Sequence, residues 1–142
     1  MSGSPFFDTT ILLYAVSETD ARAVIAQELL AAGGHISVQV LNEFAAVARR
    51  KFKKSWKEIS AALDDIRSSC EPVTPLTVLV HEAALKIAAD SGYNIYDALI
   101  LAAAIDALIL AAAIDAGCDT VYSEDMQNGQ KIGPITIHNP FL

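Results

Sequence analysis

Residues 96–117 read YDALILAAAIDALILAAAIDAG, a stretch that contains a perfect tandem repeat. The unit DALILAAAI occupies residues 97–105 and occurs again at residues 106–114. Apart from the aspartate, every residue of the unit is apolar. Alanine and leucine are strong helix formers, and Gly117 is a typical residue just beyond a helix end. We therefore predict one buried helix over residues 96–116, with the carboxylate of Asp97 at its start.

The length of the repeated unit sets the phase of its acids. Nine residues advance a helix by about 13.5 Å and about 900°, which is half a turn out of phase. On a continuous helix, Asp97 and Asp115 would share one face and Asp106 would point the other way. The two copies therefore cannot present their acids to the same site.

Length and composition indicate a single globular domain over residues 1–142. The chain is 53% hydrophobic and 19% charged, which excludes a disordered protein. Its net charge of −7 argues against nonspecific coating of nucleic acid. Two cysteines, the lack of a signal peptide and apolar runs too short to span a bilayer predict a soluble protein of the cytoplasm.

Short apolar segments alternate with helical patterns along the chain, which predicts a three-layer α/β/α sandwich around a parallel sheet of about four to five strands. One predicted helix begins at Ser55 and has Trp56, Ile59 and Ile66 on its apolar stripe. The predicted strands cover residues 5–7, 35–38, 71–75, 119–123 and 135–137, and the other predicted helices cover residues 18–32, 40–53 and 77–90.

Four acids follow strands or begin helices in this pattern. Asp8 and Asp125 each come after a predicted strand, and Glu43 and Asp97 lie near predicted helix starts. In a parallel sheet these positions meet at one edge, where ligands bind. We therefore expect the four carboxylates to converge.

Clustered carboxylates repel one another, and a hard divalent cation such as Mg²⁺ or Mn²⁺ relieves that repulsion. Thr9, Thr10 and Ser123 are hydroxyl residues beside the acids and are expected to hydrogen-bond the carboxylates or ordered waters. Six of the ten basic residues lie between residues 49 and 57. Those predicted to hold a phosphate backbone beside the metal are Arg49, Arg50, Lys51, Lys53 and Lys54.

The acidic motifs resemble those of PIN-domain nucleases in their order and spacing. They are Phe7-Asp8-Thr9-Thr10, Asn42-Glu43, Tyr96-Asp97-Ala98 and Tyr122-Ser123-Glu124-Asp125. The C-terminal SEDMQNGQ and NPF are similar to the VapC-like toxins of bacterial toxin–antitoxin pairs. The resemblance implies a Mg²⁺- or Mn²⁺-dependent endoribonuclease that is commonly dimeric and is inhibited by an antitoxin segment in its active-site groove. It implies Asp8, Glu43, Asp97 and Asp125 as catalytic metal ligands.

The repeat departs from the family pattern, which has this helix once. Either copy can occupy the family's position, which leaves Asp106 as an alternative ligand to Asp97. A third arrangement is one long helix with residues 119–142 packed on a partner subunit, a domain swap. We favour the continuous helix, because the three-residue connection from Gly117 to Asp119 cannot return about 13.5 Å within one subunit.

Other interpretations of the acids remain open. Instead of binding a metal, Asp8 and Asp97 can stabilise the starts of the helices that follow them. Glu124 is an alternative to Asp125 as a metal ligand. As a function of another class, the chain can be a catalytically impaired PIN-like interaction module or an engineered duplication variant that acts only by binding protein.

Overall fold

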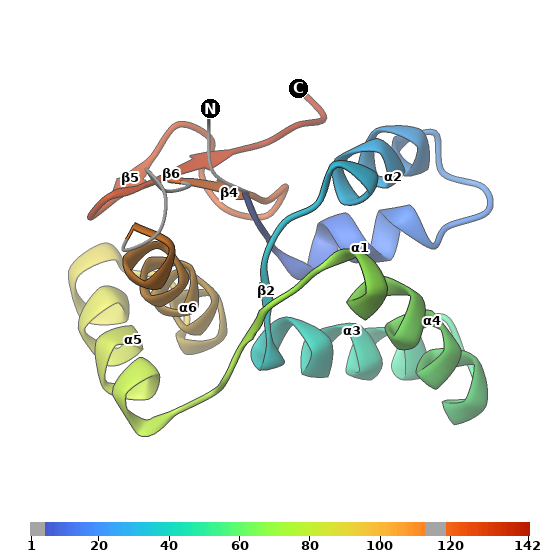
Figure 1. The fold of residues 1–142 in the computed structure, drawn as a ribbon, viewed down its shortest axis with the longest axis horizontal. Coiled ribbons are helices and arrows are strands. Elements are labelled where there is room, and N and C mark those ends of the chain that lie inside the picture. The colour runs from blue at the N-terminus through green and yellow to red at the C-terminus, as the bar shows by residue number, and fades with distance from the viewer. Residues whose placement is uncertain (1–4, 113–118) are drawn as a thin grey trace.

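The computed structural model describes residues 5–112 and 119–142. Within these ranges six helices surround two sets of short strands (Figure 1). The helices are α1 (Thr9–Ala15), α2 (Arg22–Ala32), α3 (Val38–Arg50), α4 (Trp56–Ser69), α5 (Val78–Ser91) and α6 (Ile95–Ala112). The strands are β1 (Phe6–Phe7), β2 (Ile36–Ser37), β3 (Val73–Thr74), β4 (Thr120–Tyr122), β5 (Lys131–Ile132) and β6 (Ile135–His138).

The main sheet has the order β1-β4-β6-β5, and all of its pairs are parallel except β5 with β6. A second, parallel pair joins β2 to β3. A bridge between Phe6 and His35 connects the two sets, with the Phe7 amide donating to the His35 carbonyl at 2.9 Å. The predicted α/β sandwich with a mostly parallel sheet is confirmed.

Local caps explain where several helices begin and end. Ser37, Ser55 and Thr77 each accept a hydrogen bond from a backbone N–H in the first turn of the following helix. Gly92 ends α5 in the left-handed conformation that glycine adopts without strain. The predicted starts at Ser55 and Thr77 and the stop at Gly92 are confirmed.

Helix α6 runs without a break from Ile95 to Ala112, through the first copy of the repeat and most of the second. Residues 98–104 are all buried, and Ile100 and Leu101 have no exposed surface. The helix packs along α5 beside the strands (Figure 1). The predicted continuous helix is confirmed as far as Ala112, and its predicted end at residues 113–116 lies outside the described residues.

The C-terminal segment pairs with its own chain. Phe7 of β1 lies opposite Tyr122 of β4, and β6 extends the sheet from β4. The argument that this segment cannot return to its own subunit is therefore wrong. Six residues separate Ala112 from Asp119, and a chain of six residues can span up to about 20 Å, more than the repeat adds. A domain swap is not required to complete the sheet.

Some predicted boundaries are also wrong. Helix α3 begins at Val38, so Glu43 lies in its second turn and not at its start. Strand β5 lies in a segment predicted as loop. Trp56, predicted on the buried stripe of α4, has 59% of its surface exposed, whereas Ile59 and Ile66 are buried as predicted. Among the described residues, no helix is long and apolar enough to cross a membrane.

Candidate active site

Asp8 is held at the point where β1 passes into α1. Because β1 and β4 are parallel and in register, the residues that follow them, Asp8 and Ser123, are neighbours. The Ser123 hydroxyl donates to Asp8 Oδ2 at 2.6 Å, and the Thr9 amide donates to Oδ1 at 2.6 Å. Asp8 therefore has both carboxylate oxygens occupied, and it caps α1 as well.

The environment of Asp8 disfavours its charge. Only 3% of the residue is exposed. The pKa of Asp8 is raised from 3.8 to about 7, chiefly by burial and to a smaller extent by the charges of Asp97 and Glu43, while the hydrogen bonds from Ser123 and Thr9 act in the opposite direction. A buried carboxylate with acidic neighbours is a place where a cation would be stabilised.

Glu43 faces the same point from α3. The Thr9 hydroxyl donates to Glu43 Oε2 at 2.8 Å, and the Gln39 side chain donates to Oε1 at 3.2 Å. Gln39 and Glu43 are four residues apart and so lie on one face of the helix. Thr9 therefore links two acids, with its amide on Asp8 and its hydroxyl on Glu43.

Asp97 is in the first turn of α6. The Asn94 side chain donates to Asp97 Oδ2 at 3.1 Å, and the Asp97 amide donates to Asn94 Oδ1 at 2.9 Å. Burial, followed by the charges of Glu43 and Asp125, raises the pKa of Asp97. Asp97 thus interacts with acids from two other elements.

Asp125 follows β4 by three residues. Burial and the neighbouring Glu124 raise the pKa of Asp125, while Lys51 lowers it. Electrostatic interactions link Asp8 to Asp97 and Glu43, and Asp97 to Glu43 and Asp125, so the four predicted acids lie near enough to influence one another.

Asp106 is partly exposed in the middle of α6. It lies about 13.5 Å further along the axis than Asp97 and half a turn away. Among the described residues, the acids that raise the pKa of Asp8 or Asp97 are Asp97, Glu43 and Asp125. The geometry therefore brings the acid of the first copy to the group.

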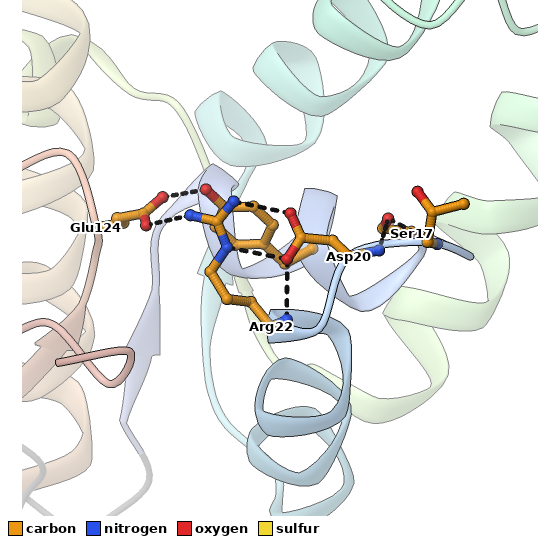
Figure 2. Close-up of polar contacts among 6 residues, drawn as sticks. Ser17, Asp20, Arg22 and Glu124 are labelled. Carbon is orange, nitrogen blue, oxygen red and sulfur yellow. Dashed lines mark hydrogen bonds and ion pairs between the residues drawn. The ribbon is translucent and has the colours of Figure 1, made fainter.

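Glu124 is directed toward Arg22, which also pairs with Asp20 (Figure 2). Arg22 Nη1 pairs with Glu124 at 2.7 Å while Nη2 pairs with Asp20 at 2.8 Å. The Tyr14 hydroxyl also donates to Glu124, and the Arg22 guanidinium lies 4.1 Å from the centre of the Tyr14 ring. With these partners Glu124 ties the loop that carries Asp125 to α1 and α2.

Sequence reasoning missed several of these supporting residues. Gln39 and Asn94 had a detectable signal, because each lies at helical spacing from an acid. Arg22 and Tyr14 had none, since they are 102 and 110 residues from Glu124 in the chain. Of the predicted hydroxyls, Thr9 and Ser123 contact carboxylates, whereas the Thr10 hydroxyl accepts from the Glu124 amide at 3.4 Å.

The predicted basic residues lie where α3 ends and the chain turns into α4, and all are exposed. Lys51 is close enough to lower the pKa of Asp125, which places this end of the cluster beside the acids. Arg49 donates to the Lys54 carbonyl at 3.1 Å, and Lys54 lies 4.0 Å from Glu58. The basic corner and the acidic group are therefore adjacent.

The four acids have the type of ligand atom that a hard divalent cation prefers, because each offers carboxylate oxygens. Their side chains, however, are further apart than the ligands of a bound ion. Within residues 5–112 and 119–142, no three His, Cys, Asp or Glu side chains stand so that they could hold a metal ion as they are. The carboxylates would have to draw together around an ion.

A separate cavity of about 340 Å³ lies between α1, α2 and α4 and contains none of the four acids. It is lined by Ala15, Val16, Gln27, Leu30, Ala31, Ala62, Asp65, Ile66 and Ser69.

Comparison with known proteins agrees with this fold. The model of the PIN domain matches residues 6–105, so the match ends with the last residue of the first copy. The structure is similar to the crystal structure of VapC20 of Mycobacterium tuberculosis, a sarcin–ricin loop cleaving toxin. That likeness has a TM-score of 0.64 and 21% identity, and it covers 86% of this chain and 90% of the other.

A second similar structure is VapBC2 of Rickettsia felis bound to a DNA fragment from its promoter. Here the TM-score is 0.63 and the identity 20%, with 98% of both chains covered. No curated protein sequence matches the chain significantly.

Proposed function

This chain belongs to the PIN-domain family, and we propose that it is a Mg²⁺- or Mn²⁺-dependent endoribonuclease that hydrolyses phosphodiester bonds of RNA. The observation that carries the proposal is the set of electrostatic interactions that links Asp8, Glu43, Asp97 and Asp125. These acids come from four separate elements, and their mutual charges are among the causes that raise the pKa of Asp8 and Asp97. Such an arrangement lowers the stability of the fold. Acids with raised pKa values that lie close together are therefore typical of functional sites.

The four acids would be the ligands of the metal, which when bound lowers the pKa of water and stabilises the leaving oxygen. The chain's own residues prepare this site. Ser123 and the Thr9 amide fix Asp8, while Thr9 and Gln39 fix the two oxygens of Glu43. Asn94 orients Asp97. The basic corner beside Asp125 would hold the phosphate backbone of the substrate.

We further propose that the chain is the toxin of a toxin–antitoxin pair, with an antitoxin protein as its partner. The two structural relatives, a sarcin–ricin loop cleaving toxin and a VapBC2 complex, support this proposal. We also propose that the protein forms a homodimer. We also propose that residues 1–142 form one domain and that the protein acts in the cytoplasm.

Cleavage of RNA tests the main proposal. The purified chain is incubated with RNA in Mg²⁺, in Mn²⁺ or in EDTA. We expect cleavage with either ion and none in EDTA, and we expect Asp8→Asn to lose it. Asp64→Asn is the matched control, because Asp64 is an exposed acid on α4. Equal cleavage by Asp8→Asn and the parent would contradict the proposed site.

A second candidate is the catalytically impaired interaction module. The open arrangement of the acids favours it, because no described group is ready to hold a metal. A calorimetric titration of the protein with Mn²⁺ distinguishes the two candidate functions. Binding that Asp8→Asn abolishes supports the nuclease, whereas absence of binding and of cleavage in a chain that still binds its antitoxin supports the module.

A further inference from the structure

The corner between α3 and α4 exposes aromatic side chains among its basic residues. Residues 49–58, which span the end of α3, the connection and the first turn of α4, are all exposed. Phe52 has 52% of its surface exposed and Trp56 has 59%. Large aromatic side chains are normally buried because each removes a large apolar area from water. Their exposure here needs an explanation.

Both aromatic rings lie close to cations. The Arg49 guanidinium is 5.0 Å from the centre of the Trp56 ring, and Lys51 Nζ is 5.8 Å from the centre of the Phe52 ring. The backbone beneath Trp56 is fixed by a capping box, in which Ser55 and Glu58 exchange hydrogen bonds at 3.1 Å and 3.0 Å. Trp56 is therefore presented by a rigid helix start.

The charge of this corner is opposite to that of the whole chain. Residues 49–57 carry six basic residues and no acid, in a chain of net charge −7. A polyanion with flat, unsaturated rings would complement both the cations and the aromatic faces.

We propose that the corner formed by residues 49–57 is a stacking platform for unpaired bases of an RNA substrate. Trp56 and Phe52 would stack on bases, and the neighbouring lysines and arginines would contact phosphates. The inference rests on the proposed ribonuclease function and adds to it which side chains hold the bases of the substrate. Paired bases in an A-form helix do not offer their faces for such stacking.

Trp56 makes the platform directly observable, because it is the only tryptophan of the chain. Its fluorescence is measured in EDTA, where cleavage is not expected, while a twelve-nucleotide single-stranded RNA is added. We expect saturable quenching that weakens with salt. The same RNA in a perfect duplex is expected to bind about tenfold more weakly, as loss of one stacked base would predict.

Variants assign the effect to the rings. Affinity for a labelled single-stranded RNA is measured by anisotropy. Trp56→Ala is expected to bind about tenfold more weakly, Phe52→Ala somewhat less so, and Trp56→Phe close to the parent. Leu79→Ala is the control, because Leu79 is a 77% exposed apolar residue on α5. Circular dichroism checks that each variant is folded.

Unquenched fluorescence together with equal affinity of Trp56→Ala and the parent would overturn the platform. Quenching by a protein partner but not by RNA would also overturn it and would assign the corner to that partner. These results are separable from those on the proposed function. Metal-dependent cleavage without quenching leaves the nuclease and removes the platform, whereas quenching without cleavage leaves an RNA-binding platform and removes the nuclease.

Discussion

The two copies of DALILAAAI are identical in sequence and occupy different environments on one helix. In the first copy Ala98 has no exposed surface and Leu99 has 8% exposed, whereas their equivalents Ala107 and Leu108 are partly exposed. Asp97 joins the acidic group, and Asp106 lies half a turn away from it.

This difference shows that helix propensity and burial are separate matters. Both copies form helix because their alanines and leucines favour it wherever they are placed. Burial depends on the partners within reach, and α5, β2, β3 and α3 all contact α6. The first copy has the position beside these elements, so Ala98 and Leu99 are core residues, whereas their equivalents Ala107 and Leu108 are only partly buried against that core.

The largest difference is expected in catalysis. Asp97→Asn should reduce metal-dependent RNA cleavage about a thousandfold, because it replaces one of the four negatively charged carboxylates of the site with a neutral amide. Asp106→Asn should cleave within about threefold of the parent, a change of under 1 kcal/mol. Single-turnover rates at saturating Mg²⁺ measure both. A reversed pattern would mean that the second copy supplies the acid in solution.

The stability of the metal-free protein should depend on pH, because Asp8 is buried near Asp97 and Glu43. The pKa of Asp8 in the folded state is raised from 3.8 to about 7, so folding favours its protonated form. This contribution to stability is fully present below about pH 4 and is lost as the pH rises through 7. The loss can reach about 4 kcal/mol.

Urea unfolding in EDTA at several pH values measures this loss, and Asp8→Asn should flatten the curve over the same range. A parent whose stability rises between pH 4 and pH 7 by more than Asp8→Asn does would contradict the expected sign.

Truncation of matched leucines tests the difference in packing. Leu99→Ala should lower the free energy of unfolding by about 3 kcal/mol, since it leaves a cavity in the core. Leu108→Ala, at the equivalent position of the second copy, should cost about 1 kcal/mol because that side chain is only half-buried. Chemical denaturation measures both, and equal losses would show that the two copies are equally packed.

Removal of residues 106–114 should have the smallest effect. The remaining chain reads YDALILAAAIDAGCDT and retains every residue matched to the PIN domain. We expect a folded protein whose RNA cleavage lies within about threefold of the parent, a change of under 1 kcal/mol. Loss of folding upon this deletion would show that the second copy is structural.

Sequence reasoning was most accurate where the cause is local. Ser55, Thr77 and Gly92 mark helix ends because their own side chain or conformational freedom does so. It was less accurate for Trp56, since helical spacing identifies a stripe but not how much of that stripe a neighbour covers. Strand β5 was missed because two residues in a polar segment, Lys131 and Ile132, carry no period.

The candidate site divides in the same way. Its four acids were named from their places after strands and near helix starts, and Thr9 and Ser123 from their adjacency to acids. Asn94 and Gln39 are identifiable in retrospect by spacing. The ion pair of Arg22 with Glu124 cannot be identified from the sequence, because the two residues are 102 positions apart and only the tertiary fold brings them together.

By itself, the sequence determined that this chain alternates strands with helices, that one helix begins near residue 96 and continues through the first copy of the repeat into the second, and that four acids follow the pattern of one family. These properties arise from interactions between residues near one another in the chain. Only the tertiary structure decided that Ala98 and Leu99 are more deeply buried than Ala107 and Leu108, that Asp97 interacts with Asp8, and that Trp56 stays exposed. Identical segments cannot differ in their local preferences, so only contacts with distant parts of the chain can distinguish them.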